Sequence, residues 1–257
     1  MANVLVCIKR VPDSSSELVL TDDGQSVDAR HVGYTVSPHE ECAVELAVQI
    51  AAATGGSATV LTLGPAEALE QLRDAIAVGC SAAVLIEADA DRYGASDVAD
   101  AIADLVQSHE AQGKPYDLVL LGNDAADTGD FQVGVRLGYA LDRPVVTGMS
   151  TVELSADTFV ARGDGLDGTR VFEVAAPAVV TIMEGGVTPR YPSIPGRMRA
   201  KRTAVETVTP IRKPTGSGRV RLKLPPVQPS SVQILGEGPT AAPAVVDLLM
   251  ELGVLSR

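Results

Sequence analysis

The chain has 257 residues, of which 46% are hydrophobic, and a formal net charge of −12. This length and apolar content suffice for a substantial core, which excludes disordered, collagen-like and small disulfide-stapled proteins. The acidic balance and an aromatic content of 3% also argue against nucleic acid as a partner, because phosphate contacts need cationic side chains and single strands need stacking surfaces.

Short apolar runs alternate with longer amphipathic stretches through the first 150 residues. The runs predict the strands Val4–Ile8, Ala58–Leu63, Ala82–Ile86, Leu118–Leu121 and Pro144–Val146. Apolar strands separated by helices are typical of a parallel sheet that is covered on both faces and joined by right-handed crossovers. We therefore expect an α/β fold with a doubly wound parallel sheet. Its ligand site should lie beyond the carboxyl ends of the strands, where the strand order reverses.

Two boundaries between a strand and a helix carry clear signals. Ser37-Pro38 precedes Glu40, which places a capping hydroxyl, a first-turn proline and a carboxylate where a helix begins. Gly64-Pro65 ends a strand and opens the helix around Leu69.

The pattern changes after Met149. Three short alternating runs, separated by turn residues, predict a β-hairpin appendage over residues 150–175: they are Thr151–Leu154, Thr158–Ala161 and Arg170–Val174. The apolar run Ala178–Ile182 then returns the chain to the main sheet as a further strand.

The remaining sequence is rich in proline, glycine and arginine. Residues 190–223 contain ten basic residues against Glu206 alone, and repeated prolines forbid long regular elements. Pro243–Leu255 predicts an amphipathic terminal helix that packs on another subunit or on its own domain. We therefore divide the chain into an α/β domain that includes the hairpin, 1–188, and a basic docking segment with an extended C-terminal arm, 189–257.

The cysteines and the amino terminus indicate a compartment. Cys7, Cys42 and Cys80 lie in apolar sequence without CxxC spacing, as expected of buried thiols in a reducing cytoplasm. The first strand runs directly into Lys9 and Arg10 without the features of a signal peptide. No run approaches the ~20 apolar residues that a membrane span needs. We expect a cytoplasmic protein.

Motifs of the common catalytic classes are missing from the sequence. It contains no GxxxxGKS or GxxxxGKT, no GxSxG, no HExxH and no paired CxxC, and its GxGxxG stretch, Gly163–Gly168, separates two short predicted strands instead of leading from a strand into a helix. Its three histidines stand at no metal-ligand spacing, so we expect neither catalytic residues nor a metal site. His39 remains of interest because it follows Ser37-Pro38 at a helix amino terminus, where amides can receive an anion.

The most informative loop leaves an apolar strand and enters a helix through small residues. It consists of Gly122, Asn123, Asp124, Ala125, Ala126, Asp127, Thr128, Gly129, Asp130, Phe131, Gln132 and Val133. In a doubly wound fold such a loop binds nucleotides: glycines permit close approach, helix amides receive phosphate, and Asp or Gln side chains bind ribose or base. A well-capped helix start is an equal alternative. Because carboxylates repel phosphate, the aspartates must cap the helix or face sugar hydroxyls.

Several ordered segments together resemble the β subunit of electron-transfer flavoproteins. They are Val6–Asp13 with its Lys9-Arg10-Val11-Pro12-Asp13 turn, Ser37-Pro38 followed by Glu41, Glu45 and Ala47, Leu63-Gly64-Pro65, the Asp127–Gly134 loop, Pro177–Thr181, Pro189–Pro195, and Met198 with Ala200-Lys201. The resemblance extends from Val4 to about Arg202 and weakly along the tail. It implies a doubly wound sheet of the type that binds adenine nucleotides. It also implies a heterodimer in which an α subunit supplies most of an FAD site.

The resemblance further implies an adenine nucleotide, usually AMP, buried in this subunit. By matching positions, AMP contacts the main chain of Cys7, the turn Ser37-Pro38-His39-Glu40, Leu63 and the loop Gly122–Val133. A bifurcating variant of the family holds a second FAD in place of AMP, and the loop sequence fits either group.

The resemblance also implies a docking site for a flavin dehydrogenase. The matching residues are Glu184, Gly185, Gly186, Val187, Pro189, Arg190 and Tyr191. Electrons would pass from that donor through the shared FAD to a membrane-bound or soluble quinone-linked oxidoreductase, so the chain is an electron carrier rather than an enzyme. Alternatives are a solvated basic arm that crosses the α subunit, or a redox-inactive nucleotide-binding subunit. A nucleotide hydrolase or ligase would need a pyrophosphate loop such as SGGxDS after the first strand, which Lys9–Asp13 does not provide.

Overall fold

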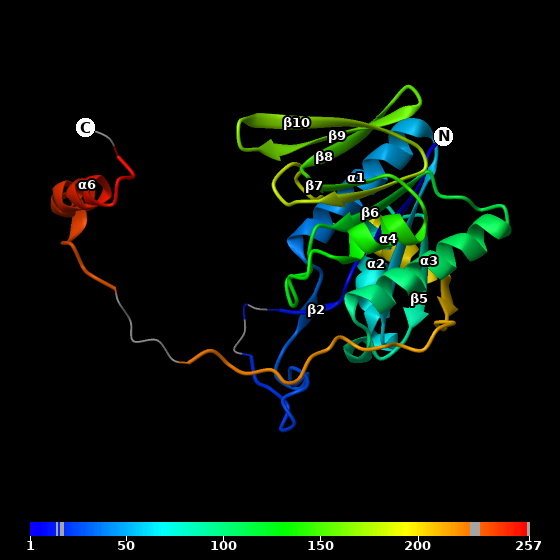
Figure 1. The fold of residues 1–257 in the computed structure, drawn as a ribbon, viewed down its shortest axis with the longest axis horizontal. Coiled ribbons are helices and arrows are strands. Elements are labelled where there is room, and N and C mark those ends of the chain that lie inside the picture. The colour runs from blue at the N-terminus through cyan, green and yellow to red at the C-terminus, as the bar shows by residue number, and fades with distance from the viewer. Residues whose placement is uncertain (14, 16–17, 227–231, 256–257) are drawn as a thin grey trace. The chain divides into compact units, whose positions relative to one another are not determined.

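The computed structural model describes residues 1–13, 15, 18–226 and 232–255 (Figure 1). The chain forms two compact units, Met1–Leu222 and Lys223–Arg257. In the second unit a 3₁₀ turn leads into helix α6 (Ala242–Glu251), which confirms the terminal helix that the sequence predicts. The predicted arm residues 227–231 and 256–257 lie outside the described part of the chain.

The first unit is built on a seven-stranded parallel sheet, which confirms the predicted doubly wound fold (Figure 1). The strand order is β12-β5-β4-β1-β6-β11-β7, and it reverses between β1 and β6, because the chain leaves β5 and returns on the other side of β1. The strands are β1 (Asn3–Cys7), β4 (Ser57–Gly64), β5 (Ala82–Glu87), β6 (Leu118–Gly122), β7 (Val145–Met149), β11 (Ala178–Ile182) and β12 (Val205–Val208).

Helices cover both faces of this sheet because the buried strands are apolar on both sides. Residues of α1 and α2 pack with Val4 and Val6 in one core cluster, whereas residues of α3 and α4 pack with Leu5 and Cys7 in the other. The alternation along β1 thus separates the two layers of the core. The helices are α1 (Pro38–Thr54), α2 (Leu69–Val78), α3 (Ala95–Ala111), α4 (Val133–Ala140) and α5 (Ile194–Arg202), with the short 3₁₀ helices Ala66–Ala68 and Ala90–Arg92.

The predicted appendage is a three-stranded antiparallel sheet. It consists of β8 (Thr151–Ser155), β9 (Thr158–Gly165) and β10 (Gly168–Ala175), in the order β10-β9-β8. A second small pair, β2 (Val11–Pro12) with β3 (Tyr34–Thr35), lies in the long connection between β1 and α1. Among the described residues, no helix has both the length and the apolar character that crossing a membrane requires.

The structure departs from the predicted arm between residues 189 and 222. This segment belongs to the first compact unit and contains α5 and β12, which extends the main sheet beside β5. Proline limits the length of an element but does not prevent a short one: Pro195 lies in the first turn of α5, where a missing N–H costs nothing.

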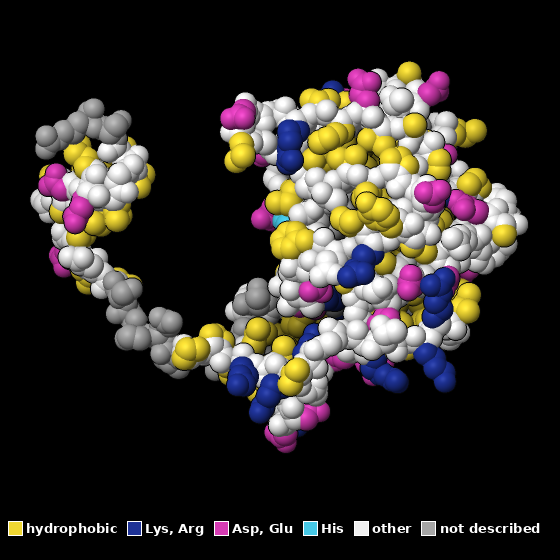
Figure 2. All heavy atoms as spheres, in the orientation of Figure 1, with side chains coloured by type: hydrophobic (Ala, Val, Ile, Leu, Met, Phe, Trp, Pro, Cys, Tyr) yellow, Lys and Arg dark blue, Asp and Glu magenta, His cyan; other side chains and the backbone are white. Residues whose placement is uncertain are grey.

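The basic residues that follow β12 lie across the acidic helix α3. The guanidinium of Arg212 contacts Asp104 at 2.7 Å and Asp100 at 3.5 Å. The amide of Thr215 donates to Asp97 at 2.9 Å. Figure 2 shows dark-blue basic side chains along the course of this segment. Residues 209–222, which we call the strap, therefore pack on their own domain.

Candidate functional site

The predicted nucleotide residues come from the carboxyl ends of β1, β4 and β6 and from the start of α1, and the strand order reverses between β1 and β6. Cys7 and Leu121 are partners in the register of these two strands. A Cβ added at Gly122 would lie 2.6 Å from Cγ of Glu40 and 3.2 Å from Cβ of His39. The absence of a side chain at Gly122 therefore lets the end of β6 approach the first turn of α1, as a tight strand-to-loop junction requires.

Three contacts fasten the loop of residues 123–132, which we call the nucleotide loop, to the neighbouring elements. The hydroxyl of Ser37 accepts a hydrogen bond from the amide of Ala126 at 3.0 Å. The ammonium of Lys9 lies 2.7 Å from Oδ1 of Asp127, and Nδ1 of His39 lies 2.6 Å from Oδ1 of Asp124. Asp127 and Asp124 thus lie beside basic side chains that follow β1 and begin α1.

Glu40 lies buried at the centre of this junction. Its carboxylate accepts a hydrogen bond from the amide of Ser37 at 3.2 Å, which is the acidic half of a capping box. Burial raises the pKa of Glu40 to about 8, although backbone hydrogen bonds from Lys9 and Ser37 act in the opposite direction. Burial, with a smaller effect of Glu40, also raises the pKa of the Cys7 thiol. Cys7 is therefore a neutral thiol, and its main chain is the polar group at this strand end.

The other loop residues serve to shape the loop. The amide of Asn123 donates to the carbonyl of Ile182 at 2.8 Å, and its side-chain oxygen accepts from the hydroxyl of Thr181 at 2.6 Å. The amides of Thr128 and Gly129 both donate to the carbonyl of Ala125, which makes a tight turn. Two further loop residues, Asp130 and Phe131, are exposed. Outside the loop, the predicted residue Leu63 is buried at the end of β4, and Pro38 is the first residue of α1.

The amino terminus of α4 follows this loop and suits an anion. Gln132 occupies the N-cap position, but no side chain caps the helix, and its first turn contains no acidic residue. The side-chain oxygen of Gln132 instead accepts hydrogen bonds from the guanidinium of Arg136. The first amides of a helix have no partner within the helix and lie at the positive end of its dipole. The start of α4 therefore presents amide donors that the helix itself leaves unpaired.

Lys9 and Thr181 belong to this site although the sequence indicates them only weakly. Lys9 lies within the Lys9–Asp13 turn that carries the family resemblance, and Thr181 lies within the apolar run of β11. Their contacts with Asp127 and Asn123 join residues that are 118 and 58 positions apart. Only the strand order brings such residues together.

The predicted docking residues lie between β11 and α5, in residues 183–193, which we call the docking segment from here on, and several of them are held in place. The guanidinium and amide of Arg190 contact the carboxylate of Glu45 on α1. The carbonyl of Val187 accepts from the thiol of Cys42 at 3.5 Å, and a Cβ at Gly186 would lie 2.0 Å from the carbonyl oxygen of Ser150. Glu184 and Gly185 are exposed, Pro189 is half-buried, and Tyr191 is 95% exposed.

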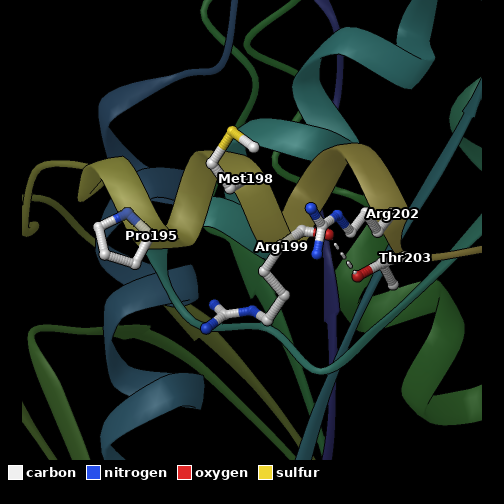
Figure 3. Close-up of a pocket in the computed structure, with 5 residues that line it drawn as sticks. All are labelled: Pro195, Met198, Arg199, Arg202 and Thr203. Atoms are coloured by element: carbon white, nitrogen blue, oxygen red, sulfur yellow. Dashed lines mark hydrogen bonds between the residues drawn. The ribbon is translucent and has the colours of Figure 1, made fainter.

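A surface hollow lies beside the docking segment on α5 (Figure 3). It is lined by Pro195, Met198, Arg199, Arg202 and Thr203. The carbonyl of Arg199 accepts a hydrogen bond from the hydroxyl of Thr203 at 3.0 Å, and the guanidinium of Arg199 donates to the carbonyl of Ile76 at 2.6 Å. A second hollow lies between residues 25–26, 89–92 and 216–219. Neither hollow is lined by the predicted nucleotide residues.

The chain is similar to known proteins over most of its length. A family model described as the electron transfer flavoprotein domain matches residues 26–212. The electron transfer flavoprotein subunit beta of Bacillus subtilis is 33% identical over 214 residues, which cover 79% of this chain and 77% of that protein. The subunit of the same name from Syntrophomonas wolfei is 31% identical over 236 residues, 91% of this chain and 90% of the relative. The acryloyl-CoA reductase electron transfer subunit gamma of Anaerotignum propionicum is 32% identical over 198 residues, 76% and 73% of the two chains.

Proposed function

We propose that this chain, which belongs to the electron transfer flavoprotein family, is the β subunit of a heterodimeric electron carrier whose FAD is held mainly by an α subunit. The bound flavin supplies the redox chemistry by taking up and giving up electrons. The residues of this chain bind and position the nucleotide and dock the partner proteins. The three buried free cysteines support placing the protein in a reducing cytoplasm.

We assign a structural AMP to the carboxyl ends of β1 and β6. The observation that carries this assignment is the convergence of the nucleotide loop, the first turn of α1 and the end of β1 at the reversal of strand order. The amino terminus of α4 provides amides for the phosphate, and Leu63 and the main chain of Cys7 border the site. The ligand fills the strand ends and holds the loop.

We assign the contact with a donor flavin dehydrogenase to the docking segment and the adjoining α5. Tyr191 and Ile194 are 95% and 81% exposed, and Arg197 and Arg202 are exposed nearby. An apolar anchor with a cationic rim suits an acidic partner that must associate quickly and leave again. The acceptor would be a membrane-bound or soluble quinone-linked oxidoreductase.

Release of nucleotide from the purified heterodimer tests the assignment. The full chain is purified together with its α subunit, its absorbance spectrum is recorded, and acid-released nucleotides are separated and quantified. Equal amounts of FAD and AMP would support the proposed carrier. A complex without flavin would overturn it.

A second candidate function is that of a bifurcating carrier with a second FAD in the AMP site. It is favoured by the similarity to the acryloyl-CoA reductase electron transfer subunit of Anaerotignum propionicum. In the same measurement, about two FAD per heterodimer and no AMP would replace the ordinary carrier with this one.

A further inference from the structure

The nucleotide loop presents an electrostatic problem for the proposed site. It contains Asp124, Asp127 and Asp130 within seven residues, directly before the helix whose amides would receive a phosphate. Like charges at short range disfavour binding, and the effect is stronger at a partly buried position than in bulk water. A site for an anion therefore needs something that removes the charge of the loop.

Lys9 supplies such compensation from outside the loop. Its ammonium lies 2.7 Å from Oδ1 of Asp127, and the two side chains are only 35% and 24% exposed. His39 stands in the same relation to Asp124, at 2.6 Å, and adds a charge whenever its ring is protonated. Asp130 is exposed, so water screens its carboxylate. Two of the three loop carboxylates thus have a basic side chain beside them, Lys9 after β1 and His39 in the first turn of α1.

Glu40 does not compete for Lys9 at neutral pH. Its carboxyl is buried beside Lys9, and burial raises its pKa to about 8, which keeps it mostly protonated. The charge that faces Lys9 is therefore that of Asp127. Lys9 and Asp127 together are therefore close to neutral. The neighbouring amide of Ala126 donates a hydrogen bond to the hydroxyl of Ser37, which holds this part of the loop against the start of α1.

We propose that Lys9 is a positioning residue for the nucleotide, which neutralises Asp127 and turns it toward β1 so that the amino terminus of α4 accepts a phosphate. This inference rests on the proposed nucleotide site. It differs from a role in which Lys9 binds the phosphate itself, because in that case Asp127 would be a competitor of the ligand.

The two roles predict opposite behaviour of the double variant. If Lys9 compensates Asp127, Lys9→Met leaves an unpaired carboxylate beside the phosphate, and adding Asp127→Asn removes the repulsion and restores affinity. If Lys9 binds the phosphate, Asp127→Asn alone tightens binding, and the double variant remains weak.

The test measures binding of AMP and adenosine by calorimetry at pH 7, with the full chain freed of bound nucleotide. We expect Lys9→Met to weaken AMP about tenfold and adenosine less than about twofold, because only AMP carries the repelled charge. The double variant should bind AMP within about threefold of wild type. Lys114→Met, at an exposed lysine of another loop, is the matched control and should change neither affinity.

Each other outcome has a distinct meaning. Equal losses for AMP and adenosine, or failure of Asp127→Asn to rescue Lys9→Met, would overturn the compensating role. Wild-type protein that binds AMP while Lys9→Met leaves the ratio of the two affinities unchanged would overturn this inference alone. Wild-type protein that binds neither compound would overturn the nucleotide site and this inference with it.

Discussion

Arg190 and Glu45 form a bidentate ion pair between the docking segment and helix α1. Nε of Arg190 lies 2.8 Å from Oε2 and Nη2 lies 2.6 Å from Oε1 of Glu45, whose side chain is 4% exposed. Burial alone would raise the pKa of Glu45, but hydrogen bonds from Arg190 and Gln49 outweigh it and hold the pKa below its usual value. The segment that presents Tyr191 is therefore anchored just before its exposed part.

Removing Arg190 should destabilise the domain. Arg190→Met leaves the buried Glu45 carboxylate without its cation and should lower the free energy of unfolding by about 1–3 kcal/mol. The loss is not larger because the Arg190 side chain is 48% exposed, so water reaches this side of the pair. Adding Glu45→Gln should recover much of this loss. Urea unfolding measures both effects, with Lys201→Met as the control for loss of an exposed cation. Equal effects of Arg190→Met and Lys201→Met would show that the pair does not anchor the segment.

Glu40 should make the stability of the protein fall with rising pH. Its pKa is raised from 4.5 to about 8 in the folded state, so the folded state binds more protons than the unfolded state in that interval. Its stabilising contribution is complete below the unfolded pKa and is lost as pH rises through the folded pKa, at up to about 1.4 kcal/mol per pH unit. Urea unfolding of wild type and Glu40→Gln between pH 5 and 8 measures this. Parallel profiles would contradict the buried, protonated carboxyl.

Asp97 should hold the strap on the domain. Its carboxylate accepts from the amide and hydroxyl of Thr215 and from the amides of Gly216 and Gly94, at 2.7–3.0 Å. Although burial raises the pKa of Asp97, these bonds lower it to about 2. Its contribution is therefore present above the ordinary pKa and lost as pH falls toward 2.

Asp97→Asn should cost about 1–3 kcal/mol at neutral pH and speed proteolysis within the strap. The difference from wild type should shrink as pH falls from about 4 toward 2, because wild type then loses the same interaction. Asp100→Asn is the matched control, because Asp100 contacts Arg212 only at 3.5 Å from a more exposed position. A strap that is cleaved equally fast in both variants would refute the role of Asp97.

Ile194 should contribute to docking of the donor dehydrogenase. Ile194→Glu introduces a charge at an 81% exposed apolar side chain, and we expect it to slow electron uptake about tenfold while bound flavin and melting temperature stay unchanged. Stopped-flow reduction of the heterodimer by a flavin dehydrogenase measures the rate. Ile211→Glu makes the same change at an equally exposed isoleucine of the strap and should leave the rate unaffected. Equal slowing by both variants would indicate a general charge effect.

The apolar pattern of the sequence determined most of the fold. The strand predicted at Ala178–Ile182 has those bounds in the structure, and Ser37-Pro38 marks the start of α1. Such local signals suffice because buried parallel strands and helix caps depend on neighbouring residues. Among the elements that the sequence did not predict, α5 and β12 are short, and α5 carries a proline in its first turn inside a basic stretch, where composition alone favours an irregular chain.

The side-chain partners were decided only by the tertiary structure. The sequence marks the aspartates of the nucleotide loop and the run of basic residues, but it does not show that Asp127 contacts Lys9 or that Arg190 contacts Glu45, 145 positions away. These pairs depend on the reversal of strand order and on the return of β11 beside β6, which bring distant segments together. The sequence therefore shows which residues carry charge. Only the strand order of the sheet shows which of them neutralise one another, because Coulomb interactions depend on distance in space.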